Sequence, residues 1–224
     1  MDPAYFMRPV TAKQLYQMAH DTQRILEAHG VRCVASGGTL LGAVRNGGII
    51  PWDDDADFSI DMKHKRKVGS ARPDFENCGY ELLPVPYGYK VCMRKRRRIP
   101  GEKHSYPFVD LFFHREGRNG RVSLAQDWAT NAWPNDFYLK KEYHPLRRVP
   151  FHDISVWIPR DPLPYLKRMY GADWATVGYR TYDHARERSI DESEPITRKV
   201  TLAPRDLKAA QPSGKVVKRR CLPS

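Results

Sequence analysis

The sequence predicts an α+β domain in which a small mixed or antiparallel sheet is flanked by helices. Residues 11–29 have the apolar spacing of an amphipathic helix. Residues 53–60 alternate acidic and apolar side chains, as a half-buried strand does. Residues 80–93 and 146–158 each contain two strand-like runs around a turn. A chain of 224 residues is long enough to form one such domain with a buried core.

The first predicted elements lead to a glycine-rich segment. Thr11 is a candidate N-cap of the first helix and Gly30 ends it. The apolar face of that helix contains Leu15, Met18, Thr22, Ile25 and Leu26. We expect a short strand at residues 31–35 and a short helix at 39–44 whose N-terminus faces a site. The glycines at 47–48 predict a turn.

Four carboxylates lie within five residues just after this turn. In a strand over residues 53–60, Asp53, Asp55 and Asp57 share one face, and Asp54 points to the other. Carboxylates ~5 Å apart repel by about 3 kcal/mol per pair at an effective dielectric constant near 20. Such crowding requires water, protons or a cation, and oxygen ligands suit Mg²⁺ or Mn²⁺. A solvated acidic turn is the alternative, but the alternation with apolar residues favours a site.

The middle of the chain combines basic runs with strands. Residues 63–67 indicate a solvated loop or a helix start, and residues 80–83 and 89–93 are expected to be strands around the turn 84–88. The densest charge run is Arg94-Lys95-Arg96-Arg97-Arg98. This basic loop 94–98 is either an exposed flexible segment or a contact for phosphate groups.

One acid lies inside a strongly strand-like run. Asp110 is surrounded by apolar residues in the segment 108–113. An unpaired buried charge is costly, so this carboxylate needs a partner. Two interpretations remain open: a salt bridge to an arginine in the core, or a third metal carboxylate beside Asp55 and Asp57.

The last part of the folded region contains further turn and helix signals. Residues 118–121 predict a hairpin turn, and residues 128–143 are aromatic and irregular with a turn at 133–136. Residues 146–151 and 154–158 indicate a hairpin. Asp161-Pro162 begins a helix that Gly171 ends, with inward residues Leu163, Leu166 and Met169.

The glycine-rich segment and the acids together resemble one protein family. Residues 38–45 read Gly-Thr-Leu-Leu-Gly-x-x-Arg, and residues 50–57 read Ile-Pro-Trp-Asp-Asp-Asp-x-Asp. This string of about twenty residues is similar to the LicD family, which includes the fukutin-related transferases. The resemblance implies the nucleotidyltransferase fold, with neighbouring strands that carry the three metal ligands Asp55, Asp57 and Asp110. It extends loosely over residues 11–184.

The resemblance also implies a reaction. The donor would be a CDP-linked alcohol such as CDP-choline or CDP-ribitol, and a sugar or glycan hydroxyl would accept phosphocholine or a polyol phosphate. Mg²⁺ or Mn²⁺ on the three acids would neutralise charge, and Asp53 or Asp110 would take the proton of the acceptor. A nucleotidyltransferase that acts on nucleic acid or another nucleotide acceptor is the alternative function.

The residues before the acids are candidate substrate-binding groups. Gly37, Gly38 and Thr39 can offer backbone N–H groups and a hydroxyl to phosphate, and Gly42 permits close backbone approach. Arg45 is predicted either to clamp a phosphate oxygen or to pair with Asp53 or Asp54. Trp52 is predicted either to stack on a base or choline head or to anchor the core. His184 is a further candidate for substrate contact, whereas His104, His114 and His144 have no metal-ligand spacing.

Charge and composition divide the chain into three parts. We expect an arm at residues 1–10, a domain at 11–194 and a basic disordered tail at 195–224. The formal net charge is +12, and eight of the 38 Lys and Arg residues fall in this tail. An anionic partner is therefore predicted for the tail and for the basic loop 94–98.

The chain as given has no signal peptide and no run of eighteen apolar residues. These features predict a cytoplasmic protein without a transmembrane segment. The four cysteines form no CxxC pair. Reduced thiols are expected, and a Cys78–Cys92 disulfide is the alternative.

Overall fold

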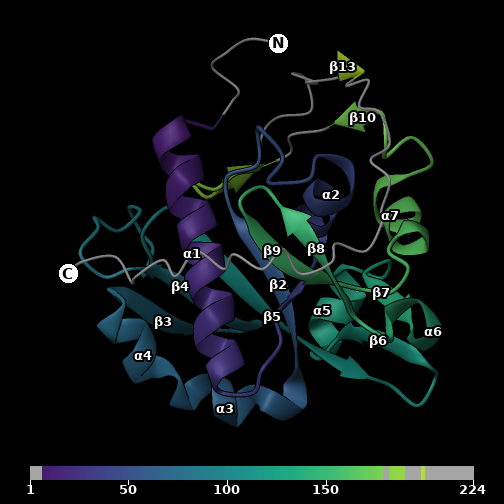
Figure 1. Cartoon of the computed structure of the whole chain (residues 1–224), viewed down its shortest axis with the longest axis horizontal. Coiled ribbons are helices and arrows are strands. Elements are labelled where there is room, and N and C mark those ends of the chain that lie inside the picture. The colour runs from purple at the N-terminus through teal and green to yellow at the C-terminus, as the bar shows by residue number, and fades with distance from the viewer. Residues whose placement is uncertain (1–6, 179–181, 190–197, 200–224) are drawn as a thin grey trace.

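A mixed sheet forms the centre of the computed structural model, which describes residues 7–178, 182–189 and 198–199. The strands of this sheet are β1 (Val34–Ala35), β2 (Ala56–Asp61), β3 (Tyr80–Val85), β4 (Gly88–Met93), β5 (Phe108–Glu116), β6 (Arg121–Leu124), β7 (Phe137–Leu139), β8 (Arg147–Phe151) and β9 (Ile154–Ile158). Their order is β3-β4-β5-β2-β1-β9-β8, with β6 joined to β5 and β7 joined to β6 (Figure 1). The β2–β5 and β1–β9 pairs are parallel and the other pairs are antiparallel.

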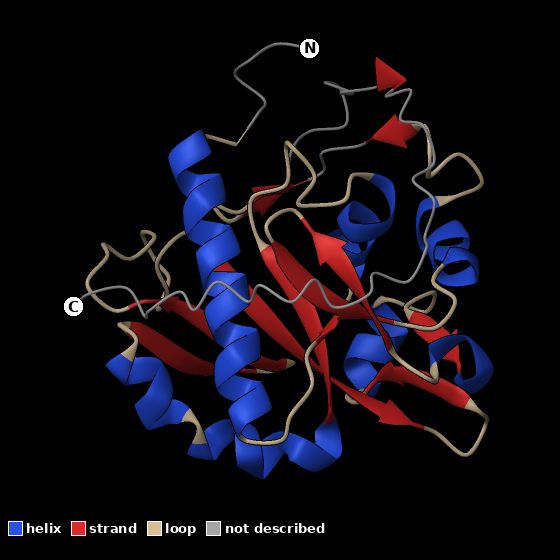
Figure 2. Ribbon diagram, in the orientation of Figure 1, coloured by secondary structure: helices blue, strands red, loops and turns tan. Residues whose placement is uncertain are grey.

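Helices lie around this sheet, as Figure 2 shows in blue. They are α1 (Pro9–Ala28), α2 (Gly37–Arg45), α3 (Lys65–Ser70), α4 (Arg72–Asn77), α5 (Asp127–Ala132), α6 (Lys140–Tyr143) and α7 (Leu163–Tyr170), with a 3₁₀ turn η2 (Met62–His64). Two short pairs lie outside the main sheet, β10 (Val177–Gly178) with β13 (Arg198–Lys199), and β11 (Tyr182–Asp183) with β12 (Arg188–Ser189). The predicted α+β class with a mixed, helix-flanked sheet is therefore confirmed.

The first helix supplies one side of the core. Helix α1 crosses one face of the sheet over β5 (Figure 1). Its buried residues include all five predicted from the apolar spacing, Leu15, Met18, Thr22, Ile25 and Leu26. The helix begins two residues before the predicted cap Thr11, because Pro9 occupies its first turn and Arg8 its N-cap position.

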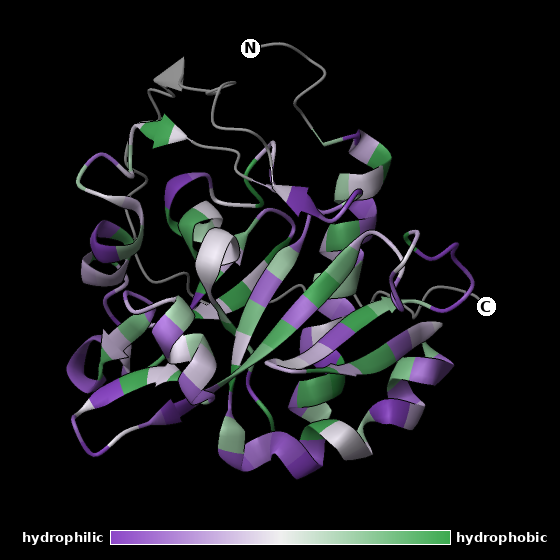
Figure 3. Cartoon of the chain, turned by 180° about the vertical axis from the view of Figure 1, so that it is seen from behind, coloured by the Kyte–Doolittle hydropathy of each residue, from purple (hydrophilic) through white to green (hydrophobic). Residues whose placement is uncertain are grey.

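The opposite face of the central strands is polar at one end. Phe58 and Ile60 of β2 are buried in the core, and they alternate with Asp57, which faces the other way. Figure 3, seen from behind, shows hydrophobic and hydrophilic stretches alternating along the strands of this sheet. The β2–β5 register pairs Asp57 with Asp110, so the acid-bearing strands are neighbours as expected.

Several predicted elements are confirmed. The hairpins β3–β4 and β8–β9, the turn before β6 and the helix α7 with its end at Gly171 all lie where the sequence indicated. The helical segment after β2 is split into α3 and α4, consistent with Gly69 and Pro73.

Other expectations are wrong. The strand β2 begins at Ala56 rather than Asp53, so residues 53–55 form a loop that enters the sheet. Residues 128–143 are not irregular, because α5, β7 and α6 cover most of them. Leu163 is 45% exposed rather than inward: it is the first residue of α7, and the buried residues of this helix are Tyr165 and Leu166.

The remaining chain features concern the cysteines and the ends. Cys33 and Cys92 are buried free thiols, which removes the Cys78–Cys92 disulfide. Within the described part of the chain, no helix has the length and apolar character needed to cross a bilayer. Of the predicted arm 1–10, residues 7–10 are described and α1 already begins at Pro9. Of the predicted tail 195–224, only residues 198–199 are described.

Candidate active site

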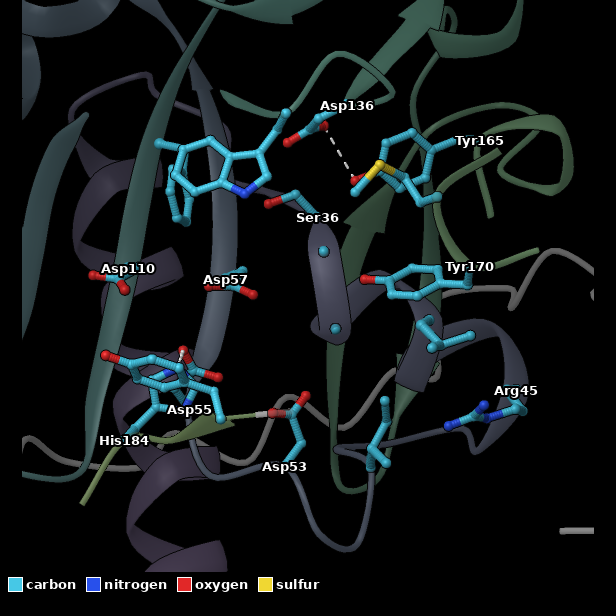
Figure 4. Close-up of a pocket in the computed structure, with 18 of the residues that line it drawn as sticks. Ser36, Arg45, Asp53, Asp55, Asp57, Asp110, Asp136, Tyr165, Tyr170 and His184 are labelled. Carbon is cyan, nitrogen blue, oxygen red and sulfur yellow. Dashed lines mark hydrogen bonds and ion pairs between the residues drawn. The ribbon is translucent and has the colours of Figure 1, made fainter. Parts of the chain in front are cut away.

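Three carboxylates meet at the ends of two parallel strands. Asp57 and Asp110 are paired in register across β2 and β5, and Asp55 lies in the loop just before β2. Each places one oxygen within 4.8 Å of the other two. Asp55 and Asp110 are each only 6% exposed, whereas Asp57 is half-buried. Figure 4 shows them side by side in one cavity with Asp53 below them.

The electrostatics of this trio favour bound protons or a cation. Burial and the neighbouring carboxylates raise the pKa values of Asp55 and Asp57 well above the ordinary range. Such shifts indicate that three negative charges are unfavourable together in this site. Three carboxylate oxygens at this spacing fit a hard divalent cation, so the residues present can hold a metal ion.

Asp110 has two partners that the sequence did not reveal. The Lys90 ammonium donates to this carboxylate at 3.0 Å, and the Tyr87 hydroxyl donates to it at 2.9 Å. Lys90 is 6% exposed and lies over the Phe108 ring, 3.2 Å from the ring centroid. The two interpretations of Asp110 are thus both partly right, because the acid belongs to the trio and is ion-paired, with a lysine instead of an arginine. The sequence feature that could have identified Lys90 is that it is a single charged residue in an otherwise uncharged strand.

His184 connects the acidic loop to the C-terminal part of the domain. Its Nδ1 lies 2.7 Å from an Asp54 oxygen and its Nε2 lies 3.3 Å from an Asp55 oxygen. Burial lowers the pKa of His184, but the hydrogen bond to Asp54 and the charge of Asp55 outweigh it and raise the pKa to about 9. Asp54 is only 5% exposed and lies outside the trio, in agreement with a supporting role.

Asp53 lies close to the trio without belonging to it. Its carboxylate lies against Gly38 at the start of α2. Burial raises the pKa of Asp53 to about 6, with a further increase from the charge of Asp54 and a decrease from His184. Asp53 is therefore a fourth carboxylate in the cavity, outside the group of three that could hold a metal ion.

The N-terminus of α2 opens into the same cavity. Ser36, Gly37 and Gly38 line it, so the first turn of α2 lies at the cavity, where the sequence predicted a phosphate-binding helix N-terminus. Gly37 has φ +51°, and a Cβ there would lie 2.8 Å from an Asp57 oxygen. Thr39 is placed differently from the prediction: it is buried, and its hydroxyl accepts a hydrogen bond from the Asp57 N–H at 2.7 Å. Its position relative to β2 indicates that it orients Asp57.

Gly42 packs against another part of the backbone instead of lining the cavity. It lies away from the cavity and packs against the Gly48 carbonyl and the Ile50 N–H, so a Cβ would collide with backbone. We expect Gly42→Ala to lower the free energy of unfolding by about 2–3 kcal/mol, because backbone atoms cannot move aside as a side chain can. Thermal unfolding measures this as a Tm decrease of roughly 5–10 °C.

Gly69→Ala is the matched control for this change. Gly69 lies in α3, and a Cβ there would meet only the Tyr89 hydroxyl at 3.5 Å, an ordinary contact. It should leave Tm unchanged or raise it slightly. A Tm for Gly42→Ala equal to that of Gly69→Ala would show that the loop 47–50 accommodates the methyl group.

Arg45 and Trp52 join the site to the chain beyond α7. Arg45 is buried and donates to the backbone carbonyls of Trp174 and Val177, each at 2.9 Å. It makes no ion pair with the acids among the described residues, although it lines the cavity. Trp52 is 5% exposed, packs in the core and lines the cavity, with Gly178 directly against its ring. Neither predicted pairing of Arg45 with an acid is present.

The cavity that contains these groups has a volume of about 570 Å³. Its acidic end contains the trio, Asp53 and His184, and its far end is formed by aromatic and polar side chains from β5, α7 and residues 133–136. The basic loop 94–98 is exposed and does not line it. In this loop, Arg96 donates to Gln14 and Arg98 pairs with Glu81 at 2.6 Å.

Comparison with known proteins agrees with this geometry. Residues 30–161 match the family described as LicD/FKTN/FKRP, nucleotidyltransferase domain. The chain is 31% identical over 203 residues to an uncharacterized protein of Rickettsia typhi, a match that covers 91% of this chain and 60% of that protein. It is 44% identical over 186 residues to the mouse ribitol 5-phosphate transferase FKRP, which covers 75% of this chain and 34% of that protein.

A solved structure of lincosamide antibiotic adenylyltransferase LnuA, lincomycin-bound, is similar at a TM-score of 0.39 and 14% identity, over 69% of this chain and 81% of that one. A TM-score of 0.39 is too low to support any conclusion about the family of this chain. The family match includes α2, the acidic loop, β2 and β5, and therefore every member of the carboxylate trio. The chain belongs to the LicD/FKTN/FKRP family of nucleotidyltransferase domains.

Proposed function

We propose that this protein is a metal-dependent phosphotransferase that moves a phospho-alcohol from a CDP-linked donor to a hydroxyl of a glycan. The observation that carries the proposal is the trio Asp55, Asp57 and Asp110, placed beside the N-terminus of α2 in one cavity. Family membership and the similarity to a ribitol 5-phosphate transferase support a phosphocholine or polyol phosphate as the transferred group.

The reaction forms one P–O bond and breaks another. The acceptor oxygen bonds to the phosphorus that carries the alcohol, the bridging P–O bond to CMP breaks, and the hydroxyl proton passes to a carboxylate. Mg²⁺ or Mn²⁺ on the trio would neutralise the charge of the diphosphate and of the departing CMP. The N–H groups of Gly37 and Gly38 would bind and align a phosphate oxygen.

Geometry favours Asp53 over Asp110 as the base. Both oxygens of Asp110 already accept hydrogen bonds, from Tyr87 and from Lys90. Asp53 lines the cavity and is outside the trio, so its oxygens are not needed for the cation. A carboxylate in that position can reach an acceptor hydroxyl directly or through one water.

Mg²⁺ should stabilise the folded protein reversibly. A cation at a hundred times its dissociation constant adds ~2.7 kcal/mol to the free energy of unfolding, because it binds only where the three acids are assembled. For a chain of this size Tm should rise about 5–10 °C. Thermal shift with Mg²⁺, Mn²⁺ and EDTA checks this, and an unchanged Tm in millimolar Mg²⁺, with and without CDP-choline, would contradict the metal site.

Turnover is tested by release of CMP. CDP-choline, CDP-ribitol and ATP are each incubated with Mg²⁺ and a mixture of glycans, and CMP or pyrophosphate is measured. CMP from a CDP-alcohol supports the proposal, and pyrophosphate from ATP would support the alternative nucleotidyltransferase. That alternative is less favoured because the exposed basic loop 94–98 does not line the cavity.

A further inference from the structure

We propose that the end of the cavity away from the trio Asp55, Asp57 and Asp110, together with the exposed rings of Trp133 and Trp128, is the binding site for a neutral sugar chain, the glycan acceptor. The proposal rests on the proposed function and assigns its acceptor side. The residues that line this end include Ser36, Trp133, Asp136 and Tyr165. Figure 4 shows Ser36, Asp136 and Tyr165 grouped there, on the opposite side of the cavity from His184 and Asp53.

Unused polar groups in this end indicate a ligand that hydrogen-bonds. The Ser36 hydroxyl belongs to a residue that is 4% exposed, and it has no partner within the described chain. The His114 ring, 2% exposed, lines the same cavity, and its Nδ1 is likewise unpaired among the described residues. Buried polar groups are normally hydrogen-bonded, so these two atoms leave hydrogen-bonding capacity at this end for water or a ligand hydroxyl.

The charge around Asp136 disfavours phosphate. Among the described lining residues, the cationic side chains are Arg45 and His184, which Figure 4 places away from Asp136. The Asp136 carboxylate accepts a hydrogen bond from the Tyr165 hydroxyl at 3.2 Å and keeps further acceptor capacity. The Asp136 carboxylate repels phosphate and accepts hydrogen bonds from hydroxyl groups, which suits an uncharged polyhydroxylated ligand.

The two tryptophans favour a chain of sugars over a free alcohol. Trp128 is 48% exposed and Trp133 45% exposed, and their ring centroids lie 6.0 Å apart. Large exposed aromatic groups beside a cavity are typical of binding surfaces, and the apolar C–H face of a sugar ring packs on such rings. Trp133 lines the cavity and Trp128 continues the surface outside it, on α5. A donor alcohol would end inside the cavity, whereas a glycan extends past both rings.

The test uses the full chain and an array of neutral oligosaccharides. The unmodified protein should bind a subset of these glycans, and Trp133→Ala should bind the same glycans about tenfold more weakly because ring contact is lost. Trp128→Ala should weaken the binding of trisaccharides more than the binding of monosaccharides. Leu163→Ala, which removes another exposed apolar side chain outside the cavity, is the control and should not change glycan binding.

Calorimetric binding of CDP-choline and CDP-ribitol separates acceptor from donor. The affinity of Trp133→Ala for both donors should stay within twofold of the unmodified protein. The proposal is overturned if this variant no longer binds CDP-ribitol but still binds the oligosaccharides. It is also overturned if the unmodified protein binds no glycan of the array. A protein that binds glycans but never releases CMP would instead refute the proposed function and leave the sugar site standing.

Discussion

Replacement of Asp55 or Asp57 by asparagine is expected to reduce transfer from a CDP-alcohol by roughly 10³-fold or more, since each change removes one charge that holds the cation. The oxygens of Asp55, Asp57 and Asp110 lie within 4.8 Å of one another, so all three can contact one cation. Asparagine keeps the shape of the side chain. Release of CMP measures the loss, and thermal shift should show that the Mg²⁺-dependent rise in Tm has gone.

The stability of these variants distinguishes a site from a structural cluster. Burial and mutual repulsion raise the pKa values of Asp55 and Asp57, so removing either charge should leave Tm in EDTA unchanged or higher. Asp110→Asn should also abolish transfer, but it weakens the ion pair with Lys90 and should lower Tm in EDTA. A uniform decrease in Tm for all three variants would indicate that the acids hold the fold together instead of binding a cation.

Two controls complete this set. Asp74→Asn changes a half-exposed acid whose carboxylate pairs with His29 at 2.7 Å, and activity should stay within twofold. Asp54→Asn should retain most activity, because Asp54 lies outside the trio and acts through His184. An inactive Asp54→Asn with an active Asp55→Asn would mean that the metal ligands are wrongly assigned.

The acidic trio could be predicted from the sequence because local patterns carry the information. The alternation after Asp53 puts Asp55 and Asp57 on one side, and a lone acid in an apolar strand shows that Asp110 needs a partner. The resemblance to the LicD family then places Asp110 in the trio. The spatial arrangement agrees even though β2 begins only at Ala56. Asp55 is the last residue before the strand, so its side chain still follows the alternation.

The partners of the trio could not be predicted, because they depend on pairings between distant segments. Lys90 reaches Asp110 only through the register of β4 on β5, which pairs these two residues. His184 meets Asp54 across 130 positions, and Arg45 finds its carbonyl partner at Val177 across 132. A lone lysine, histidine or arginine has no periodicity that would reveal such contacts.

Lys90→Met is expected to lower the free energy of unfolding in EDTA by about 3–5 kcal/mol, because it leaves the Asp110 carboxylate buried without its counter-charge. Lys90 and Asp110 are each 6% exposed, and the Lys90 nitrogen lies 3.0 Å from the carboxylate. Methionine has a similar length and can still pack against Phe108. Thermal unfolding in EDTA should therefore show a Tm lower by roughly 10 °C or more.

Mg²⁺ should reverse most of this loss, since a cation on the trio supplies the positive charge that Lys90 no longer gives. The Mg²⁺-induced rise in Tm should thus be larger for Lys90→Met than for the unmodified protein. Lys63→Met is the matched control: Lys63 pairs with Asp61 at 2.6 Å, but its side chain is 70% exposed, so solvent screens the pair and Tm should barely change. If Lys63→Met and Lys90→Met melt alike in EDTA, or if Mg²⁺ stabilises Lys90→Met no more than the unmodified protein, Lys90 does not share the charge balance of the trio.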